Sequence, residues 1–163
     1  MIAVELVHTP ARRAGSVPPL ASGIERSSLG VGLRPVHYDH IYERWPEVGF
    51  VEVISENYLD PDSPASQHLA RISERYPVVL HGVSLNLLSH APLDDDYLDQ
   101  LCMLADRVDA AYVTDHLCWT GAHGVSHHDL LPVPYTAELV ELASERASYV
   151  QWLLGRPFGL ENL

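Results

Sequence analysis

The chain has 163 residues, of which 47% are hydrophobic and 20% charged, as expected for one globular domain. Ten basic residues against 22 acidic ones leave a net charge of −12, which argues against nucleic-acid binding because a phosphate backbone would be repelled. No apolar run reaches the roughly 18–20 residues of a membrane span, and the first residues lack the form of a secretory signal. Cys102 and Cys118 match no CxxC pattern, so we expect two reduced thiols in a cytoplasmic protein without membrane partners.

Residues 1–29 show no clean periodicity. They contain Pro10, Pro18 and Pro19 together with scattered serines and arginines. This composition predicts an irregular N-terminal leader. The folded part of the chain is expected to begin at residue 30.

Short apolar runs follow, and they are continuous rather than alternating. Such runs are typical of strands that are covered on both faces, as in a parallel sheet. The predicted strands cover residues 31–34, 50–56, 78–85, 111–119 and 158–162.

Helical patterns separate these strands. The predicted helices cover residues 38–45, 64–76, 94–108 and 136–154. Ser63, Asp94 and Thr136 stand where N-caps are expected, and Gly155 stands where the last helix should end. The alternating order predicts an α/β fold, either a barrel or a doubly wound sheet. The absence of a glycine-rich nucleotide loop after any strand favours the barrel.

Each of the last four predicted strands ends in polar residues. These residues are Glu56–Asn57, His81–Ser84, Asp115–His116 and Glu161–Asn162. The C-terminal ends of parallel strands converge on one face of a barrel. Carboxylates and imidazoles meeting there form a mixed ligand set that suits iron, manganese or zinc.

Each of these residues also has a structural interpretation. His81 could equally be a hydrogen-bonded core histidine, and the Asp115–His116 pair fits a turn. Glu161 could simply be solvated. The tract over 123–129, with His123, His127 and His128, is typical of a glycine-containing loop. The coincidence of four polar strand ends favours a metal site.

At these residues the sequence resembles the family of uncharacterised bacterial proteins that includes MbnB and TglH. The resemblance runs from residue 30 to the end of the chain. It rests on six motifs in the same order, GVGLRPVHY (30–38), EVISENYL (52–59), LHGVSLNL (80–87), TDHLCWTG (114–121), HDLLPVPYT (128–136) and LGRPFGLEN (154–162).

The resemblance implies a (β/α)8 TIM barrel of the xylose-isomerase-like type with two or three iron ions at its C-terminal face. Its characterised members use iron and dioxygen to modify cysteine or other residues of a ribosomally made precursor peptide, commonly with a small partner protein that recruits the peptide. It suggests His81, Asp115 and Glu161 as metal ligands. The other implied residues are His37, Glu56, His116 and His128 as ligands or their supporting groups, and Asn57 and Asn162 as substrate-orienting groups.

Length limits this expectation, because a (β/α)8 barrel usually needs about 250 residues. We therefore expect residues 30–163 to be the N-terminal part of such a barrel, about five β/α units truncated at the fifth strand. Alone it should be metal-poor, inactive and prone to associate. Two alternatives remain: a zinc- or manganese-dependent isomerase or hydrolase acting on a small sugar or phosphate, and a non-catalytic relic.

Overall fold

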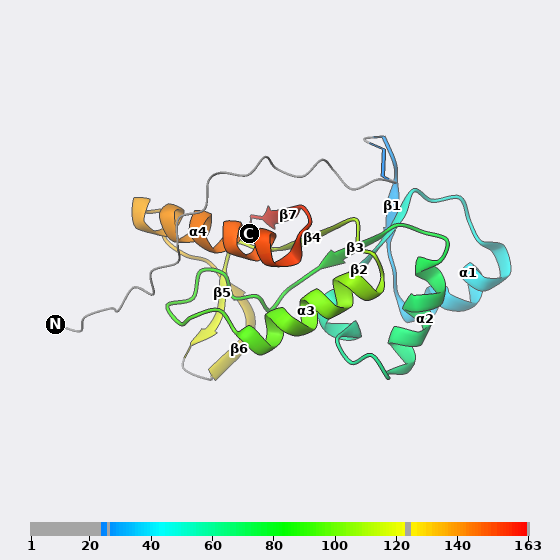
Figure 1. Cartoon of the computed structure of the whole chain (residues 1–163), viewed down its shortest axis with the longest axis horizontal. Coiled ribbons are helices and arrows are strands. Elements are labelled where there is room, and N and C mark those ends of the chain that lie inside the picture. Colours follow the sequence, from blue (N-terminus) through cyan, green and yellow to red (C-terminus); the bar gives the residue numbers. More distant parts are fainter. Residues whose placement is uncertain (1–23, 26, 123–124, 163) are drawn as a thin grey trace.

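The computed structural model describes residues 24–25, 27–122 and 125–162, so most of the predicted leader, residues 1–29, lies outside the described residues. The chain folds around a parallel sheet with the strand order β1-β2-β3-β4-β7 (Figure 1). The strands are β1 (Gly30–Gly32), β2 (Phe50–Ile54), β3 (Val78–His81), β4 (Tyr112–His116) and β7 (Phe158–Glu161).

Helices connect these strands. They are α1 (Tyr38–Arg44), α2 (Pro64–Ser73), α3 (Asp95–Arg107) and α4 (Ala137–Leu154), with short 3₁₀ helices at Pro35–His37 and Ser55–Tyr58. The strands are neighbours in the order of the chain, whereas a doubly wound sheet reverses its order at an interior strand. The predicted α/β class is confirmed, and the sequential order is that of consecutive β/α units of a barrel.

The predicted helix caps are confirmed. The Ser63 side chain accepts a hydrogen bond from the backbone N–H of Ser66, and Pro64 occupies the first helical turn of α2. Asp94 and Thr136 cap α3 and α4 in the same way. Gly155 ends α4 with a φ of 62°, a left-handed conformation that glycine adopts without strain.

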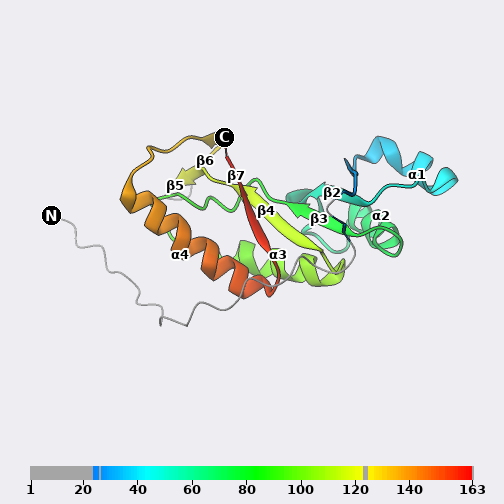
Figure 2. The same ribbon diagram turned by 90° about the horizontal axis from the view of Figure 1, so that it is seen from above.

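One face of the sheet carries the hydrophobic core. Val53, Leu80 and Val113 are at most 1% exposed and belong to one cluster with apolar side chains of the helices. Figure 2 shows α2, α3 and α4 along this side of the sheet. Because successive strand residues point to opposite faces, the residues that alternate with these, His81 and Thr114 among them, lie on the other face.

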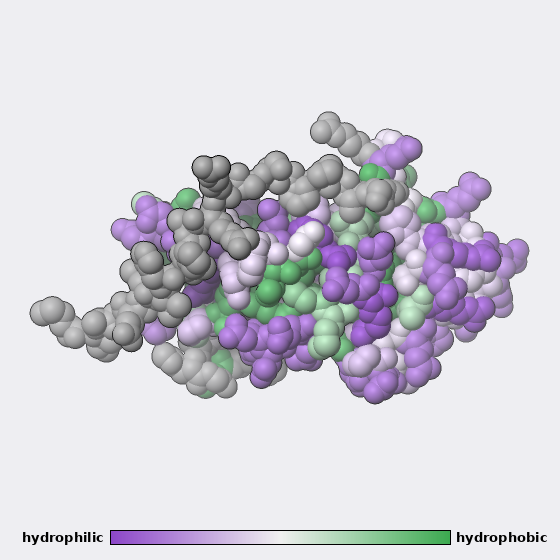
Figure 3. Space-filling view, in the orientation of Figure 1, coloured by the Kyte–Doolittle hydropathy of each residue, from purple (hydrophilic) through white to green (hydrophobic). Residues whose placement is uncertain are grey.

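The longest described helix, α4, is incompletely covered. It buries Val150 and Leu154, while Val140 and Trp152 are 60% and 61% exposed. Figure 3 shows apolar surface between α3 and α4 and mostly hydrophilic surface around α1 and α2. No described helix has the combined length and apolarity that a membrane crossing requires.

The expectation of a loop over 123–129 is wrong where the structure describes it. Residues 125–129 belong to β6 (Val125–Leu131), which pairs antiparallel with β5 (Trp119–Ala122). Polar residues suggested a loop, but a two-stranded hairpin tolerates them on its solvated side. Asn86 ties this hairpin to the segment after β3, because its Oδ1 accepts from Thr120 N at 2.6 Å and its Nδ2 donates to the Gly121 carbonyl at 2.9 Å.

Arg146 joins α4 to the segment after β3. Its guanidinium donates to the carbonyl oxygens of Leu87, Ser89 and Ala91 at 2.8–2.9 Å. The planar fork of arginine reaches several acceptors at once, which the lysine ammonium cannot reproduce. We expect Arg146→Lys to lower the free energy of unfolding by about 1–2 kcal/mol in urea denaturation. Arg44→Lys, at an exposed position, should leave it unchanged, and equal values for both variants would contradict this role.

Candidate metal centre

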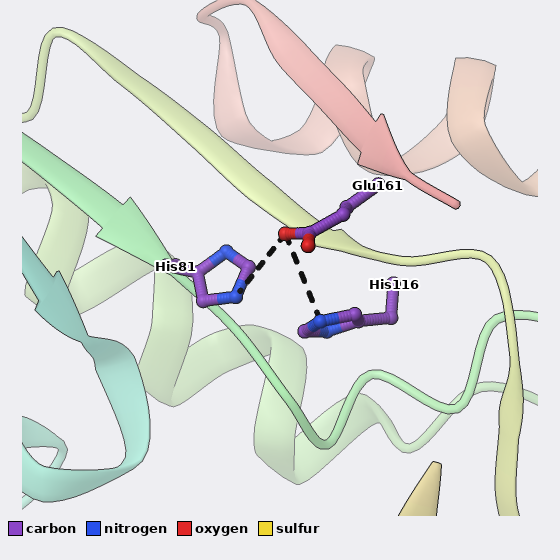
Figure 4. Close-up of side chains that lie close together, drawn as sticks. All are labelled: His81, His116 and Glu161. Carbon is purple, nitrogen blue, oxygen red and sulfur yellow. Dashed lines mark ion pairs between the residues drawn. The ribbon is translucent and has the colours of Figure 1, made fainter. Parts of the chain in front are cut away.

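Three of the predicted residues come together at the C-terminal ends of neighbouring strands. His81 ends β3, His116 ends β4 and Glu161 ends β7. The strand register aligns His81 with Thr114 and His116 with Glu161, which brings the three side chains to one edge of the sheet. Figure 4 shows them pointing toward one another.

The geometry of this cluster is that of converging ligand atoms. Glu161 Oε2 lies 3.6 Å from His81 Nε2 and 3.7 Å from His116 Nε2, and one ligand atom from each residue lies within 4.8 Å of the others. The two imidazole rings meet edge to face with their centroids 4.7 Å apart. The histidine side chains are 16% and 9% exposed, whereas Glu161 is 58% exposed.

The other ring nitrogen of each histidine is already engaged. His116 Nδ1 lies 3.2 Å from the Gly82 carbonyl oxygen, which can only accept, so Nδ1 carries the proton. His81 Nδ1 lies 2.8 Å from Thr114 Oγ1. Metal-binding histidines usually donate their second N–H to a protein acceptor in this way, which leaves the other nitrogen free to bind.

Asp115 faces away from this cluster. Its Oδ1 accepts from the His116 backbone N–H at 2.6 Å and its Oδ2 from Leu85 N–H at 3.3 Å. Burial, with a smaller contribution from the nearby Glu56 carboxylate, raises the pKa of Asp115 to about 7 against the opposing effect of these donors. The structure thus brings His116, rather than Asp115, beside His81 and Glu161. A ligand role for Asp115 stays a prediction.

Glu56 contributes an incompletely satisfied carboxylate to the same edge. Its Oε1 accepts from Val83 N–H and from the Tyr97 hydroxyl, both at 2.8 Å. Its Oε2 is buried and has no hydrogen-bond partner among the described residues. Burial, together with the charges of Glu56 and Asp115, raises the pKa of Tyr97, so this phenol stays protonated and keeps donating. A buried carboxylate oxygen without a donor is costly, and a cation would relieve it.

These donors fit a metal ion. Two imidazole nitrogens and one carboxylate oxygen form the set that non-haem iron enzymes use and that also suits zinc. Without a cation, the Nε2 lone pair of His116 would face the Glu161 carboxylate, which is repulsive. Divalent cations are attracted by both kinds of donor.

The remaining predicted residues are not among the three that form the cluster. His37 is half-buried in the 3₁₀ helix Pro35–His37, where its Nδ1 accepts from Arg34 N–H. Asn57 and Asn162 are exposed. His128 belongs to β6, and its side chain lies outside the part of the chain that the structure describes.

Thr114 and Tyr97 were not predicted as site residues. Both act through hydrogen bonds to predicted residues, Thr114 to His81 and Tyr97 to Glu56. The position of Thr114 two residues before His116 in a strand places both on one face, and this alternation was the available signal. Tyr97 lies in α3, far from Glu56 in the sequence, and nothing in the local pattern pointed to the contact.

An apolar pocket of about 400 Å³ lies close by but does not hold the cluster. It is lined by residues of α4, including Leu139 and Ala143, together with Leu117 and Leu160. Leu160 precedes Glu161 in β7, and neighbouring strand residues point to opposite faces. The pocket and the polar cluster therefore lie on different faces of the sheet.

The fold and the cluster define an α/β protein built from consecutive β/α units, with a histidine–carboxylate cluster at the C-terminal strand ends. The family model described as RiPP precursor modification enzyme MbnB/TglH/ChrH matches residues 28–163, and the chain belongs to this family.

Curated relatives are similar over most of this chain. It is 46% identical to a UPF0276 protein of Rhizorhabdus wittichii over 86% of this chain and 51% of that protein. It is 46% identical to one of Acaryochloris marina and 48% identical to one of Caulobacter vibrioides, each over 82% of this chain and 48% of the relative. The chain spans about half the length of the curated relatives it matches.

Proposed function

We propose that this chain supplies metal-binding residues to an enzyme that modifies a ribosomally made precursor peptide. The observation that carries the proposal is the convergence of His81 Nε2, His116 Nε2 and Glu161 Oε2 within 4.8 Å. Membership of a family described as RiPP precursor modification enzymes supports a peptide substrate. We further propose that the metal is iron, in two or three ions, and that the modified residue is a cysteine.

The residues of the chain have distinct parts in this proposal. His81, His116 and Glu161 would hold the metal, and the buried Glu56 Oε2, which has no hydrogen-bond partner among the described residues, would be a further donor at the same end of the sheet. Iron, when bound, supplies the capacity to bind a thiolate and to activate dioxygen. Gly82 orients His116 through its carbonyl oxygen, and Tyr97 holds Glu56 through its hydroxyl. Asn57 and Asn162, both exposed, would orient the peptide.

The surroundings of the site belong to the same proposal. We place residues 30–163 in a barrel-type metal-binding domain, to which they supply about five β/α units. A small partner protein would deliver the precursor peptide.

Cys102 and Cys118 are free thiols, as a reducing compartment such as the cytoplasm maintains. Burial raises the pKa of Cys118 to about 11, so this thiol stays protonated and the reactive thiolate would come from the peptide.

Metal analysis tests the proposal directly. The 163-residue chain is loaded anaerobically with Fe²⁺, Mn²⁺ or Zn²⁺, freed of excess metal, and its bound metal is measured beside that of the double variant H81Q/H116Q. Although we expect the isolated chain to be metal-poor, the wild-type chain should retain more Fe²⁺ than the variant. A cysteine-containing peptide should then change the absorption spectrum of the iron-loaded chain, and its serine counterpart should not. Equal metal content in both proteins would contradict the proposed ligands.

A second candidate rests on the same donor set, because two histidines and a glutamate also form hydrolytic zinc sites. A zinc- or manganese-dependent isomerase or hydrolase acting on a small sugar or phosphate would use the metal as a Lewis acid. The two functions differ in their need for oxygen. Turnover that is unaffected by the removal of oxygen, with zinc or manganese retained in preference to iron, would favour the second candidate.

A further inference from the structure

The two histidines of the cluster are oriented by different kinds of acceptor. His116 Nδ1 donates to a backbone carbonyl, that of Gly82, at 3.2 Å. His81 Nδ1 meets a side-chain hydroxyl, Thr114 Oγ1, at 2.8 Å. The orientation of His81 therefore depends on a side-chain hydroxyl that a substitution can remove. The orientation of His116 depends on a backbone carbonyl group, which every residue type provides.

The surroundings of Thr114 offer a second partner for its hydroxyl hydrogen. The hydroxyl has one hydrogen, and the Leu80 carbonyl oxygen lies 3.4 Å from Thr114 Oγ1 as its acceptor. With the hydroxyl hydrogen used there, an oxygen lone pair is left to accept from His81 Nδ1–H. The lone pair of His81 Nε2 then faces Glu161 Oε2, 3.6 Å away.

Packing fixes the side chain of Thr114. The strand register places it opposite His81 in β3 and opposite Gly159 in β7. Its methyl group points toward Gly159, where an added Cβ would lie 3.1 Å from it. A β-branched side chain in a strand has few allowed rotamers, so directing the methyl toward Gly159 holds the hydroxyl toward His81.

We propose that Thr114 is a positioning residue that keeps the proton of His81 on Nδ1 and so presents Nε2 as a metal-binding atom. This inference rests on the proposed function, because it takes the cluster of His81, His116 and Glu161 as a metal site. Without the Thr114 hydroxyl, the Glu161 carboxylate, 3.6 Å from His81 Nε2, remains as an acceptor for an imidazole proton. The proton would then move to His81 Nε2, and metal binding would have to displace it.

The first test reads the tautomer in the metal-free chain. Long-range ¹H–¹⁵N NMR spectra at about pH 8, where an ordinary imidazole is neutral, distinguish a protonated Nδ1 from a protonated Nε2. The signals of His81 and His116 are assigned with H81Q and H116Q. In the wild type we expect a protonated Nδ1 on both. Thr114→Val should move the proton of His81 to Nε2 and leave His116 unchanged, while Thr114→Ser should resemble the wild type.

The second test measures Zn²⁺ affinity by competition with a chromophoric chelator. Thr114→Val should weaken binding about 10–100-fold, as loss of an outer hydrogen-bond partner does, and Thr114→Ser should restore most of it. A protonated Nε2 on His81 in the wild type would overturn the inference, as would a tautomer change without a change in affinity. If the wild-type chain binds none of the metals tested, the proposed function fails, and the inference about Thr114 is then decided by the NMR result alone.

Discussion

Replacing Glu161 with glutamine is expected to weaken metal binding by roughly 100-fold or more. Loss of a residue that only hydrogen-bonds to a metal ligand already weakens binding by up to about this factor. Glu161 Oε2 lies within 3.7 Å of both histidine Nε2 atoms, and it is the one carboxylate oxygen in the described cluster. The amide of glutamine keeps the shape of the side chain but removes its negative charge. Anaerobic Fe²⁺ titration and Zn²⁺ competition both measure the change.

The control for this variant is Glu145→Gln. Glu145 is an exposed carboxylate of α4 and is not part of the cluster. Glu145→Gln should leave the metal affinity unchanged. Both glutamine variants should keep the free energy of unfolding within about 1 kcal/mol of the wild type. Equal metal affinities of Glu161→Gln and the wild type would show that Glu161 is not a metal ligand.

Gly82→Ala is expected to lower the free energy of unfolding by about 3 kcal/mol, the upper range for overpacking a buried site. Gly82 is buried, and a Cβ there would overlap Asp115 Oδ2 and lie 3.2 Å from the Tyr97 hydroxyl oxygen. Asp115 cannot simply turn aside, because its two oxygens accept from the N–H groups of His116 and Leu85. Urea denaturation measures the loss.

Gly32→Ala provides a matched control for this change. Gly32 lies in β1 of the same sheet, but a Cβ there would meet no atom within 4 Å. Its stability should stay the same or rise slightly, because alanine reduces the entropy of the unfolded chain. The Gly82 variant should also bind Zn²⁺ more weakly, since the Gly82 carbonyl orients His116. A Gly82→Ala protein as stable as the wild type would show that Asp115 can be relocated at little cost.

Local patterns in the sequence were sufficient to predict the fold class. The caps at Ser63, Asp94 and Thr136 act where capping chemistry placed them. The continuous apolar run 78–80 lies in β3, where all three residues are buried, as in a strand covered on both faces. The hairpin of β5 and β6 was not predicted, because its polar residues give no alternation and its position depends on distant contacts from Asn86.

The candidate site was predicted in position but not in every member. Parallel strand ends had to converge, so His81 and Glu161 were expected near each other. The choice between Asp115 and His116 depends on which face of β4 carries the core. Tyr112 and Val113 are both apolar, so the sequence leaves this open, whereas the structure buries Val113 against the helices and thereby turns His116 toward His81.

The place of Glu161 on β7 links ligand binding to local unfolding. In the described part of the chain β7 pairs with β4 alone, so its opening breaks one ladder of hydrogen bonds. The two histidines belong to β3 and β4, nearer the middle of the sheet. An ion bound by all three strands would favour the state in which β7 is paired with β4. At a free concentration about a hundredfold above its Kd, it would stabilise this paired state by about 2.7 kcal/mol. The metal would then stabilise the pairing of β7 with β4 in addition to its chemical role.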